Sequence, residues 1–535
     1  MDPNYILVLI IGLTSFVTLL RHLRLRGAKG WGSTASVVLV GVIIAVYLWP
    51  HVAGLIGLSL WAFLMLLPSL LLRRMSRQLA RQEYESARRL SYLLRLVFPQ
   101  GGWHHHPEFL RALDLAKRGL FEQSDVLLDR IATADSPLQS VARLHQLRLR
   151  DEWPEIADRL FSRLNGLHGS AAASNVPMAL RALGEAGRTE ELLPLYDRFR
   201  SVVESSSMPK ELRASCQLCV FAFAGHRNGV DELLANGLHY YPEVVKSFWQ
   251  ATTDLVAGDE TARQRLEQLS RNADPLNRQM IEYRLKHPLP SRSSLSQSSL
   301  AIVEKVRSYT DQEHYYGLLN HRPHQRGLAT RFLFILHVTV FLVEVFYGDS
   351  TNPQTLDTLG ALNLRALEGE WWRIISASLL HAGVWHLTFN MLGLYLFGPY
   401  VEYWLGGARF LLLYLFGAAG SMLFCLGDMY LFDSDRSLVG ASGFVMALLG
   451  TYTAILWRAW RRERSPLLAQ RLSFFTMLIA MQFIIDTAIE QISGEAHASG
   501  AAIGFLFGLL VHNRIPVHNR PATVEATPAS SHPEA

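Results

Sequence analysis

Apolar residues are gathered into long blocks in this chain, with an ordinary mixture of polar and apolar residues between the blocks. Residues 5–20 are almost entirely apolar, and a second block covers residues 33–72 with one interruption at Trp49–His51. A transmembrane helix needs about 20 apolar residues, so the second block is long enough for two helices, and the proline at its interruption favours a turn between them. We therefore predict about three membrane helices within residues 1–82.

The charges that flank these blocks predict their orientation. Asp2 precedes the first block and Arg21 and Arg24 follow it, while Arg73 and Arg74 follow the third predicted helix. Basic loops stay in the cytoplasm, so we expect the N-terminus outside and the end of the third helix inside. A cleaved signal peptide would carry its basic residues before the apolar stretch, and we expect a retained anchor instead.

Residues 83–287 contain no apolar run long enough to cross a bilayer, and their pattern is helical. Gly119 and Gly187 are 68 residues apart, twice 34, and Gly225 and Gly258 are 33 apart. A turn glycine followed by an apolar helix about every 34 residues resembles the tetratricopeptide repeat. Such an array stacks its helices and offers a concave surface, here for a cytoplasmic peptide or protein ligand. A helical spacer without a ligand is the alternative.

Three smaller features belong to the polar parts of the chain. Cys216 and Cys219 form a single C-x-x-C inside an apolar helical run, and because a zinc site needs four ligands, we expect them to be core cysteines. Residues 288–326 begin with a stretch rich in proline and serine and are predicted to be a linker. Residues 513–535, rich in proline, alanine and threonine, are predicted to be disordered.

Six further apolar segments predict a second membrane block. They cover residues 329–347, 382–402, 409–427, 440–457, 472–490 and 496–512. Five arginines lie between the fourth and fifth segments, from Arg458 to Arg471. This loop is therefore expected in the cytoplasm, together with the domain at 83–287, and the second, fourth and sixth segments run from outside to inside.

Two polar residues lie at the same depth in the fourth and sixth segments. Ser442 precedes Arg458 by 16 residues, and His497 precedes Arg514 by 17. At about 1.5 Å per helical residue, both lie roughly 25 Å from the cytoplasmic boundary. Polar groups buried in a membrane are costly and are usually functional.

The second segment supplies two more polar residues at this level. His386 precedes Glu402 by 16 residues, and Asn390 follows His386 by four. Residues four apart share a helical face, so both side chains are expected to point the same way.

Small residues indicate that the fourth and sixth segments touch. They recur on one face of each helix: Gly443, Ala447 and Gly450 in the fourth, and Gly500, Gly504 and Gly508 in the sixth. Such repeats let membrane helices meet backbone to backbone, and this closeness can bring a nucleophile to its base without a third carboxylate. Helix packing alone is the usual meaning of the repeat, but it does not explain the matched depth of Ser442 and His497.

Five stretches of the C-terminal block resemble the rhomboid intramembrane serine proteases. Gly440–Gly443 reads GASG, like the nucleophile motif of that family, and Ala496–Gly500 is similar to its histidine helix. His381–Asn390 fits the family's H-x₄-H-x₃-N pattern. Glu370–Arg373 resembles the first external loop, and Phe397–Glu402 resembles the end of the second helix.

The resemblance covers about residues 325–512 and implies a Ser-His dyad. Carried over, Ser442 is the nucleophile, and His497 is the general base and then the acid for the leaving amine. His386, Asn390 and the backbone N–H of Ser442 would form the oxyanion hole, since neutral donors suit the negative oxygen of a tetrahedral intermediate. No metal and no cofactor is implied.

The resemblance also extends to residues outside the dyad and the oxyanion hole, and it has one departure. His381 would lie at the outer mouth, while Arg373 and Glu370 would brace the loop rather than take part in the chemistry. The family usually has an aromatic residue four positions after the serine, packed on the histidine ring, whereas this chain has Met446. A thioether can still contact the ring edge.

Composition agrees with a membrane protein. Of the 535 residues, 50% are hydrophobic and 18% are charged, against roughly 25% charged in an ordinary soluble protein. A single soluble domain is thereby excluded. The formal net charge of +5 argues against a dedicated nucleic-acid-binding protein, and three cysteines exclude a fold stapled by disulfides.

We therefore predict an all-α polytopic protein with a six-helix rhomboid-like core at residues 327–512, an α-helical repeat domain and N-terminal membrane helices. Its predicted activity is hydrolysis of single-span membrane proteins near the outer face of a bacterial cytoplasmic membrane. A rhomboid-like protein without protease activity is the first alternative, although such proteins generally lack the serine or the histidine. A transporter is the second, and its one candidate charge, Asp486, is expected to be interfacial.

Overall fold

The described part of the chain is helical. The computed structural model describes residues 3–24, 29–167, 173–205, 208–316, 327–434, 436–488 and 493–511. Within these ranges there are no strands, apart from an isolated bridge between Leu362 and Leu438. This confirms the prediction of an all-α polytopic protein. The chain divides into two compact units, Met1–Asn320 and His321–Ala535, and the predicted tail at 513–535 lies outside the described residues.

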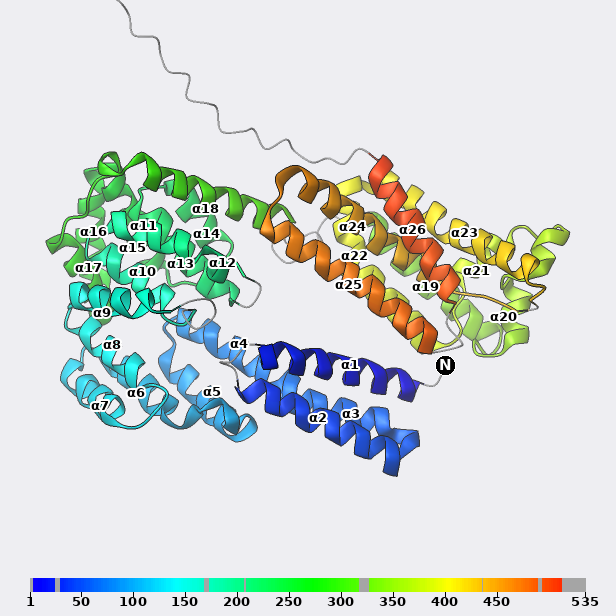
Figure 1. Cartoon of the computed structure of the whole chain (residues 1–535), viewed down its shortest axis with the longest axis horizontal. Coiled ribbons are helices and arrows are strands. Elements are labelled where there is room, and N and C mark those ends of the chain that lie inside the picture. Colours follow the sequence, from blue (N-terminus) through cyan, green and yellow to red (C-terminus); the bar gives the residue numbers. More distant parts are fainter. Residues whose placement is uncertain are drawn as a thin grey trace, which may run out of the picture. The chain divides into compact units, whose positions relative to one another are not determined.

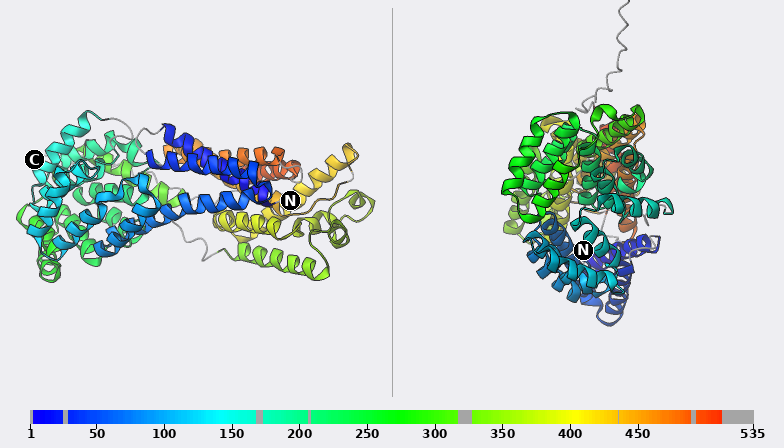
Figure 2. Two further views of the ribbon diagram at one scale, coloured as in Figure 1. Left: turned by 90° about the horizontal axis from the view of Figure 1, so that it is seen from below. Right: turned by 90° about the vertical axis from the view of Figure 1, so that its left-hand side faces the viewer.

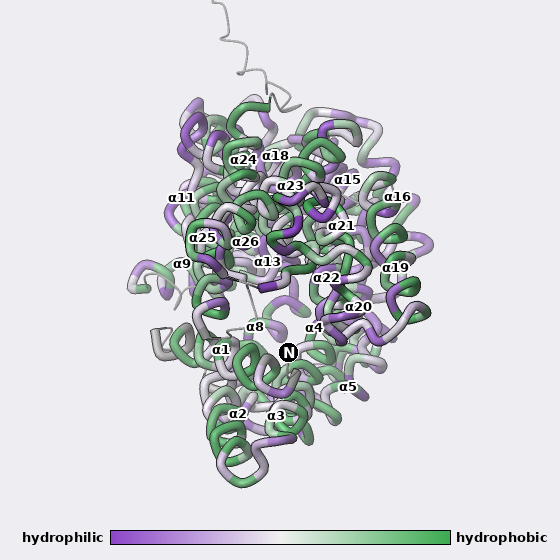
Figure 3. The backbone as a smooth tube through the Cα atoms, turned by 90° about the vertical axis from the view of Figure 1, so that its right-hand side faces the viewer, coloured by the Kyte–Doolittle hydropathy of each residue, from purple (hydrophilic) through white to green (hydrophobic). Residues whose placement is uncertain are grey.

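The first unit begins with three apolar helical stretches. These are α1 (Pro3–Arg24), α2 (Lys29–Leu48) and a third stretch formed by α3 (Ala53–Trp61), a π-turn at Ala62–Leu66 and α4 (Leu67–Ala80). Asn4 joins the first stretch to the third, because its side chain donates to the carbonyl of Pro50 at 2.6 Å and accepts from the N–H of Gly54 at 2.6 Å. Hydrophobic residues predominate along these helices (Figure 3), and several large ones are exposed, among them Val40, Ile43 and Leu55, as lipid contact requires.

Helices arranged as consecutive hairpins make up most of the rest of this unit (Figures 1 and 2). They are α5 (Tyr84–Val97), α6 (His106–Lys117), α7 (Phe121–Thr133), α8 (Gln139–Leu149), α9 (Trp153–Asn165), α10 (Val176–Glu185), α11 (Thr189–Arg198), α12 (Arg200–Val203), α13 (Lys210–Phe223), α14 (Arg227–Ala235), α15 (Glu243–Ala257), α16 (Thr261–Asn272) and α17 (Pro275–Lys286).

Four of the turns between these helices use the glycines whose spacing predicted them. Gly119, Gly187, Gly225 and Gly258 have φ of +84°, +73°, +65° and +95°, a region that residues with a Cβ rarely adopt. Backbone geometry therefore explains why glycine recurs at these positions. The helix pairs are present as expected, while their assignment to the tetratricopeptide family stays a prediction.

The core of the repeat helices includes both cysteines of the C-x-x-C. Cys216 and Cys219 are 0% and 2% exposed, and neither forms a disulfide. Burial raises the pKa of the Cys219 thiol to about 12, so this sulfur stays a neutral thiol, which is a poor metal ligand. The two residues are core cysteines, as predicted.

The segment predicted as a linker contains a packed helix. Helix α18 (Gln297–Tyr316) contacts α11 and α13. At its start, the carboxylate of Glu190 accepts from the N–H of Ser296 at 2.7 Å and from the hydroxyl of Ser299 at 2.8 Å. The serines that made this stretch look like a linker are thus partners of a carboxylate within the first unit. Residues 317–326 of the segment lie outside the described part.

The described residues of the second unit form six long helices, close to the six predicted segments. They are α19 (Leu328–Tyr347), α22 (Val384–Leu405), α23 (Gly407–Leu431), α24 (Ser442–Glu463), α25 (Pro466–Ala488) and α26 (Gly494–Leu510). The short helices α20 (Pro353–Leu359) and α21 (Arg373–Leu379) lie between α19 and α22.

Five helices in the described residues are long and apolar enough to cross a membrane. These are Gly30–Leu48, Pro50–Ala80, Leu328–Tyr347, Gly407–Leu431 and Pro466–Thr487. Helices α22, α24 and α26 fall outside this set, and they are the three that carry the predicted site residues. Their polar side chains and, for α26, a length of 17 residues account for the difference.

Helices α24 and α26 meet at their backbones. A Cβ on Gly500 would lie 2.2 Å from the carbonyl oxygen of Gly443, and a Cβ on Gly504 would lie 2.0 Å from that of Ala447. The hydroxyl of Thr451 also donates to the carbonyl of Gly504 at 2.8 Å. The small residues are therefore required by the contact, as their spacing predicted.

Candidate active site

Ser442 is the first residue of α24 and is half-buried. The turn before it depends on Gly440, which has a φ of +127° and donates its N–H to the carbonyl of Ala377 at 2.8 Å. The first N–H groups of a helix have no acceptor within the helix. The backbone N–H groups at the start of α24 can therefore bind an anionic oxygen beside the serine hydroxyl.

His386 and Asn390 of α22 lie against the same turn. A Cβ on Gly440 would lie 2.5 Å from Cε1 and 2.7 Å from Nε2 of His386, and 3.7 Å from Nδ2 of Asn390. The N–H of Ala382 donates to Nδ1 of His386 at 3.3 Å, so Nδ1 is the unprotonated nitrogen and Nε2 carries the proton. Two neutral donors from one face of α22 therefore lie beside Gly440, which precedes Ser442 by two residues.

One of these donors has no partner of its own. Asn390 is 5% exposed, and its buried Nδ2 makes no hydrogen bond within the described residues. A buried donor that is left unpaired costs about 1–3 kcal/mol. Such a group is suited to an acceptor that comes from outside the protein.

His497 lies near the start of α26, on the side that faces α24. It precedes Gly500 by three residues and Gly504 by seven, and it is 6% exposed. A Cβ on Gly443 would lie 3.5 Å from the carbonyl oxygen of Ala496. The residues next to Ser442 and His497 in the chain thus lie close together across the two helices.

No hydrogen bond joins Ser442 and His497 within the ranges that the structure describes. In the described part of the chain, the hydrogen bonds of His497 are made by Nδ1 and its backbone. Catalytic hydrogen bonds are often long in the absence of substrate and shorten when it binds. Nε2 of the ring makes no hydrogen bond among the described residues and stays available to another group.

Asp486 is a neighbour of His497 that the sequence analysis missed. Nδ1 of His497 lies 2.9 Å from both carboxylate oxygens of Asp486 on α25, and the Asp486 side chain is 4% exposed. The sequence analysis considered this aspartate only as an interfacial charge, and it did not anticipate the contact with His497. One feature of the sequence could have indicated the contact. Asp486 is the carboxylate of a mostly apolar helix, and it follows Gln482 by one helical turn.

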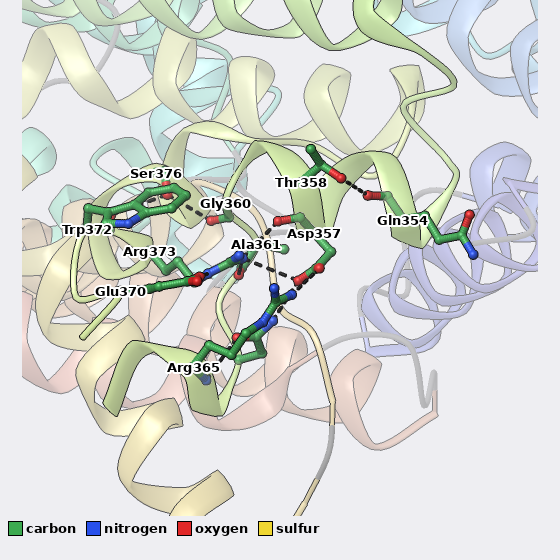
Figure 4. A network of polar contacts seen from close by, with 11 residues as sticks. Gln354, Asp357, Thr358, Gly360, Ala361, Arg365, Glu370, Trp372, Arg373 and Ser376 are labelled. Atoms are coloured by element: carbon green, nitrogen blue, oxygen red, sulfur yellow. Dashed lines mark hydrogen bonds and ion pairs between the residues drawn. The ribbon is translucent and has the colours of Figure 1, made fainter. Parts of the chain in front are cut away.

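The loop between α19 and α22 is held by a buried arginine (Figure 4). Arg373 is 3% exposed and donates to the carbonyls of Asp357 and Ala361, each at 2.8 Å. It also pairs with the carboxylate of Glu370, while Arg365 pairs with that of Asp357. Every contact stays within the loop, so Arg373 and Glu370 brace it, as predicted.

His381 is buried rather than located at an open mouth. It is 0% exposed, and its backbone N–H donates to the carboxylate of Glu344 at 3.1 Å. Its ring centroid lies 5.5 Å from that of His337 and 5.3 Å from that of His386. The residue therefore belongs to the packing behind His386.

Glu402 and Met446 also have defined surroundings. The carboxylate of Glu402 accepts from the N–H groups of Ala329 at 3.0 Å and Thr330 at 2.8 Å, which caps the start of α19. Met446 is 3% exposed, one turn after Ser442. Among the residues that the structure describes, no group of three histidine, cysteine or acidic side chains is arranged to hold a metal ion.

Comparison with known proteins finds one domain family and several relatives. The Rhomboid domain matches residues 368–514. The rhomboid protein YdcA of Bacillus subtilis is 36% identical over 155 residues, which cover 29% of this chain and 74% of that protein. Rhomboid protease GluP of the same organism is 34% identical over 185 residues, 34% of each chain.

Other relatives are more distant or are matched over a smaller part. RHOMBOID-like protein 6, mitochondrial, of Arabidopsis thaliana is 36% identical over 169 residues, 31% of this chain and 52% of that protein. Rhomboid protease AarA of Providencia stuartii is 25% identical over 216 residues, 36% of this chain and 77% of that protein. The matches to GluP and to the Arabidopsis protein thus cover a third and a half of those proteins.

Proposed function

Because this chain belongs to the rhomboid family, we propose that it is an intramembrane serine endopeptidase that cuts membrane-spanning proteins. The observation that carries the proposal is that Ser442 and His497 are both present and lie on either side of the close α24–α26 contact. A family member that only binds its clients would have no need for a nucleophile and a base at this contact.

In the proposed reaction, Ser442 Oγ attacks the carbonyl carbon of the scissile peptide. Its proton passes to Nε2 of His497 as the Oγ–C bond forms, and the carbonyl oxygen takes the negative charge. The imidazolium then gives this proton to the peptide nitrogen as the C–N bond breaks, which leaves an acyl-enzyme. Water, deprotonated by His497, hydrolyses the ester and restores the serine hydroxyl.

The oxyanion is proposed to bind between α22 and the start of α24. The donors are the backbone N–H of Ser442, Nε2–H of His386 and Nδ2 of Asn390. The proximity of both side chains to Gly440 and the unpaired amide of Asn390 support this assignment. Preorganised donors of this kind act on charge that develops in the transition state.

The substrates we propose are single-span membrane proteins cut near the outer face. The peptide must be unwound there, because the carbonyls of an intact helix are already hydrogen-bonded. The arginine-rich loop after α24 supports an orientation in which Ser442 faces outward and the repeat helices are cytoplasmic. These helices, at residues 83–287, are then suited to bind cytoplasmic tails of substrates or partners, and a bacterial cytoplasmic membrane is the proposed location.

A fluorophosphonate probe tests the proposal in native membranes. The wild-type chain should be labelled, and the Ser442→Ala variant should not. Ser499→Ala is the matched control, because this serine lies in α26 and its hydroxyl donates to backbone carbonyls of its own helix, that of Glu495 at 2.6 Å and that of Ala496 at 3.3 Å. Absence of labelling in a folded wild-type chain would favour the client-binding alternative.

A further inference from the structure

His497, the base of the proposed dyad, makes a contact through Nδ1, the ring nitrogen that the dyad does not use. A Ser-His dyad needs only Nε2 of the imidazole. Here Nδ1 of His497 lies 2.9 Å from each carboxylate oxygen of Asp486, and the two side chains are 8% and 4% exposed. The contact is therefore a direct and buried one between an imidazole and a carboxylate.

The neighbours of Asp486 aim its carboxylate at the ring. Gln482, one turn earlier on α25, donates Nε2–H to Oδ1 of Asp486 at 2.8 Å, and the same Nε2 lies 3.4 Å from Nδ1 of His497. A Cβ on Gly494, the first residue of α26, would lie 3.5 Å from Cβ of Asp486. The start of α26 and the end of α25 are thus in contact where the pair forms.

Other charged groups near this end of α26 have partners of their own. The carboxylate of Glu495 accepts from the hydroxyl of Ser493 at 3.0 Å and lies 3.5 Å from the guanidinium of Arg436. Arg436 also pairs with Asp428. Among the described residues, Asp486 is therefore the carboxylate that contacts His497.

We infer that Asp486 is a positioning residue that extends the proposed dyad to a Ser442–His497–Asp486 triad, an inference that rests on the proposed function. The carboxylate accepts Nδ1–H, which fixes the neutral tautomer with the lone pair of Nε2 directed to Ser442. When the serine proton moves to Nε2, the carboxylate stabilises the imidazolium. The proton on Nδ1 stays on the ring throughout, so Asp486 acts through His497 and is not itself protonated.

A tie between two helices is the purely structural alternative, and kinetics separates the two. The full-length chain and its Asp486→Asn variant are assayed in detergent on a single-span substrate. An amide can present its NH₂ group to Nδ1 and so favour the wrong tautomer. We expect kcat to fall by about 10²–10⁴-fold, as triad aspartates do elsewhere, while KM stays near the wild-type value. A structural tie would change thermal stability and leave kcat of the folded fraction unchanged.

Two further variants sharpen the assay. Asp486→Glu keeps a carboxylate, displaced by one methylene group, and its kcat should lie between those of the wild type and Asp486→Asn. Glu495→Gln removes a carboxylate at the same end of α26 that does not contact His497, and its kcat should match the wild type. Equal kcat for Asp486→Asn and Glu495→Gln would overturn the triad.

A measurement on the wild-type chain covers the case in which Asp486→Asn fails to fold. Nitrogen-15 NMR of the His497 ring, assigned by comparison with His497→Gln, should show the proton on Nδ1 in the resting state. A proton on Nε2 would overturn the inference. Fluorophosphonate labelling distinguishes failure of the triad from failure of the proposed function. If the wild type is labelled and the kcat of Asp486→Asn is unchanged, the protease proposal stands and the triad is rejected. If the wild type is not labelled, both proposals are rejected.

Discussion

The repeat helices of the first unit and the helices around Ser442 are held together by different kinds of residue. In the first unit, large side chains fill the contacts: Phe223 is 1% exposed, with its ring centroid 5.8 Å from that of Trp249. In the second unit, α24 and α26 meet through glycine, and a Cβ on Gly500 would lie 2.2 Å from the carbonyl of Gly443.

The solvents we propose for the two regions, water for the repeat helices and lipid for the second unit, account for the difference. In water, burying apolar side chains gives about 25 cal/mol per Å², so large residues stabilise a soluble helical array. In lipid this gain is absent, and helices associate through close backbone contact and hydrogen bonds. The geometry of the proposed site therefore depends on the glycines where α24 and α26 meet. One methyl group added at this contact should disturb the site more than a cavity made in the repeat helices.

We expect the largest loss of kcat from variants that remove the proposed catalytic side chains of the second unit and leave its helix packing intact. Ser442→Ala and His497→Ala should each lower kcat for a single-span substrate by about 10⁴–10⁶-fold, and the double variant should lose little more, because residues that act as one unit are non-additive. Cleavage in detergent measures kcat, and thermal unfolding checks the fold. Substantial turnover by either folded single variant would contradict the dyad.

A smaller loss is expected from the oxyanion site. Asn390→Ala should lower kcat by about 10–10³-fold, since one oxyanion donor is typically worth about 10²–10³ and His386 remains. Thr388→Ala is the control on the same helix, because its hydroxyl only donates to the carbonyl of Val384. A change confined to KM in Asn390→Ala would argue that the amide binds substrate rather than the transition state.

The packing of the second region can be broken directly. Gly500→Ala should lower kcat by about 10²-fold, because the methyl group forces α26 from the backbone of Gly443 and a misplacement of about 1 Å can cost that much. Gly427→Ala in α23 is the matched control, since its Cβ would meet nothing within 4 Å. Equal kcat for the two variants would show that the close contact does not set the site.

The smallest effect on cleavage is expected from breaking the first region. Phe223→Ala should lower the free energy of unfolding of the repeat helices by about 3–5 kcal/mol through the cavity it leaves. Cleavage in detergent should stay within about twofold of the wild type, because Phe223 and the candidate site belong to separate compact units, and sites without shared partners usually act independently. Denaturant unfolding of the full chain gives the first quantity, with the exposed Val126→Ala as control. If Phe223→Ala also lost cleavage activity in detergent, the repeat helices would contribute to the catalytic step.

Much of the architecture was predictable because it depends on short-range features. The long apolar segments had to be helices, since a bilayer leaves backbone groups no other partners, and the turn glycines were visible in the 33- and 68-residue spacings. The linker prediction for residues 288–326 did not anticipate α18. Its serines resemble solvent-exposed residues until Glu190, more than a hundred positions earlier, is placed beside them.

For the candidate site, the sequence by itself determined the motif around Ser442, the matched depth of His497 and the small residues that allow their helices to touch. These signals are local, or repeat along one helix. The tertiary structure alone decided that Asp486 contacts His497 and that His381 is buried. A carboxylate in an apolar helix shows that a partner is needed, but α25 is apolar around most of its circumference, so only its packing against α26 selects the side on which that partner lies.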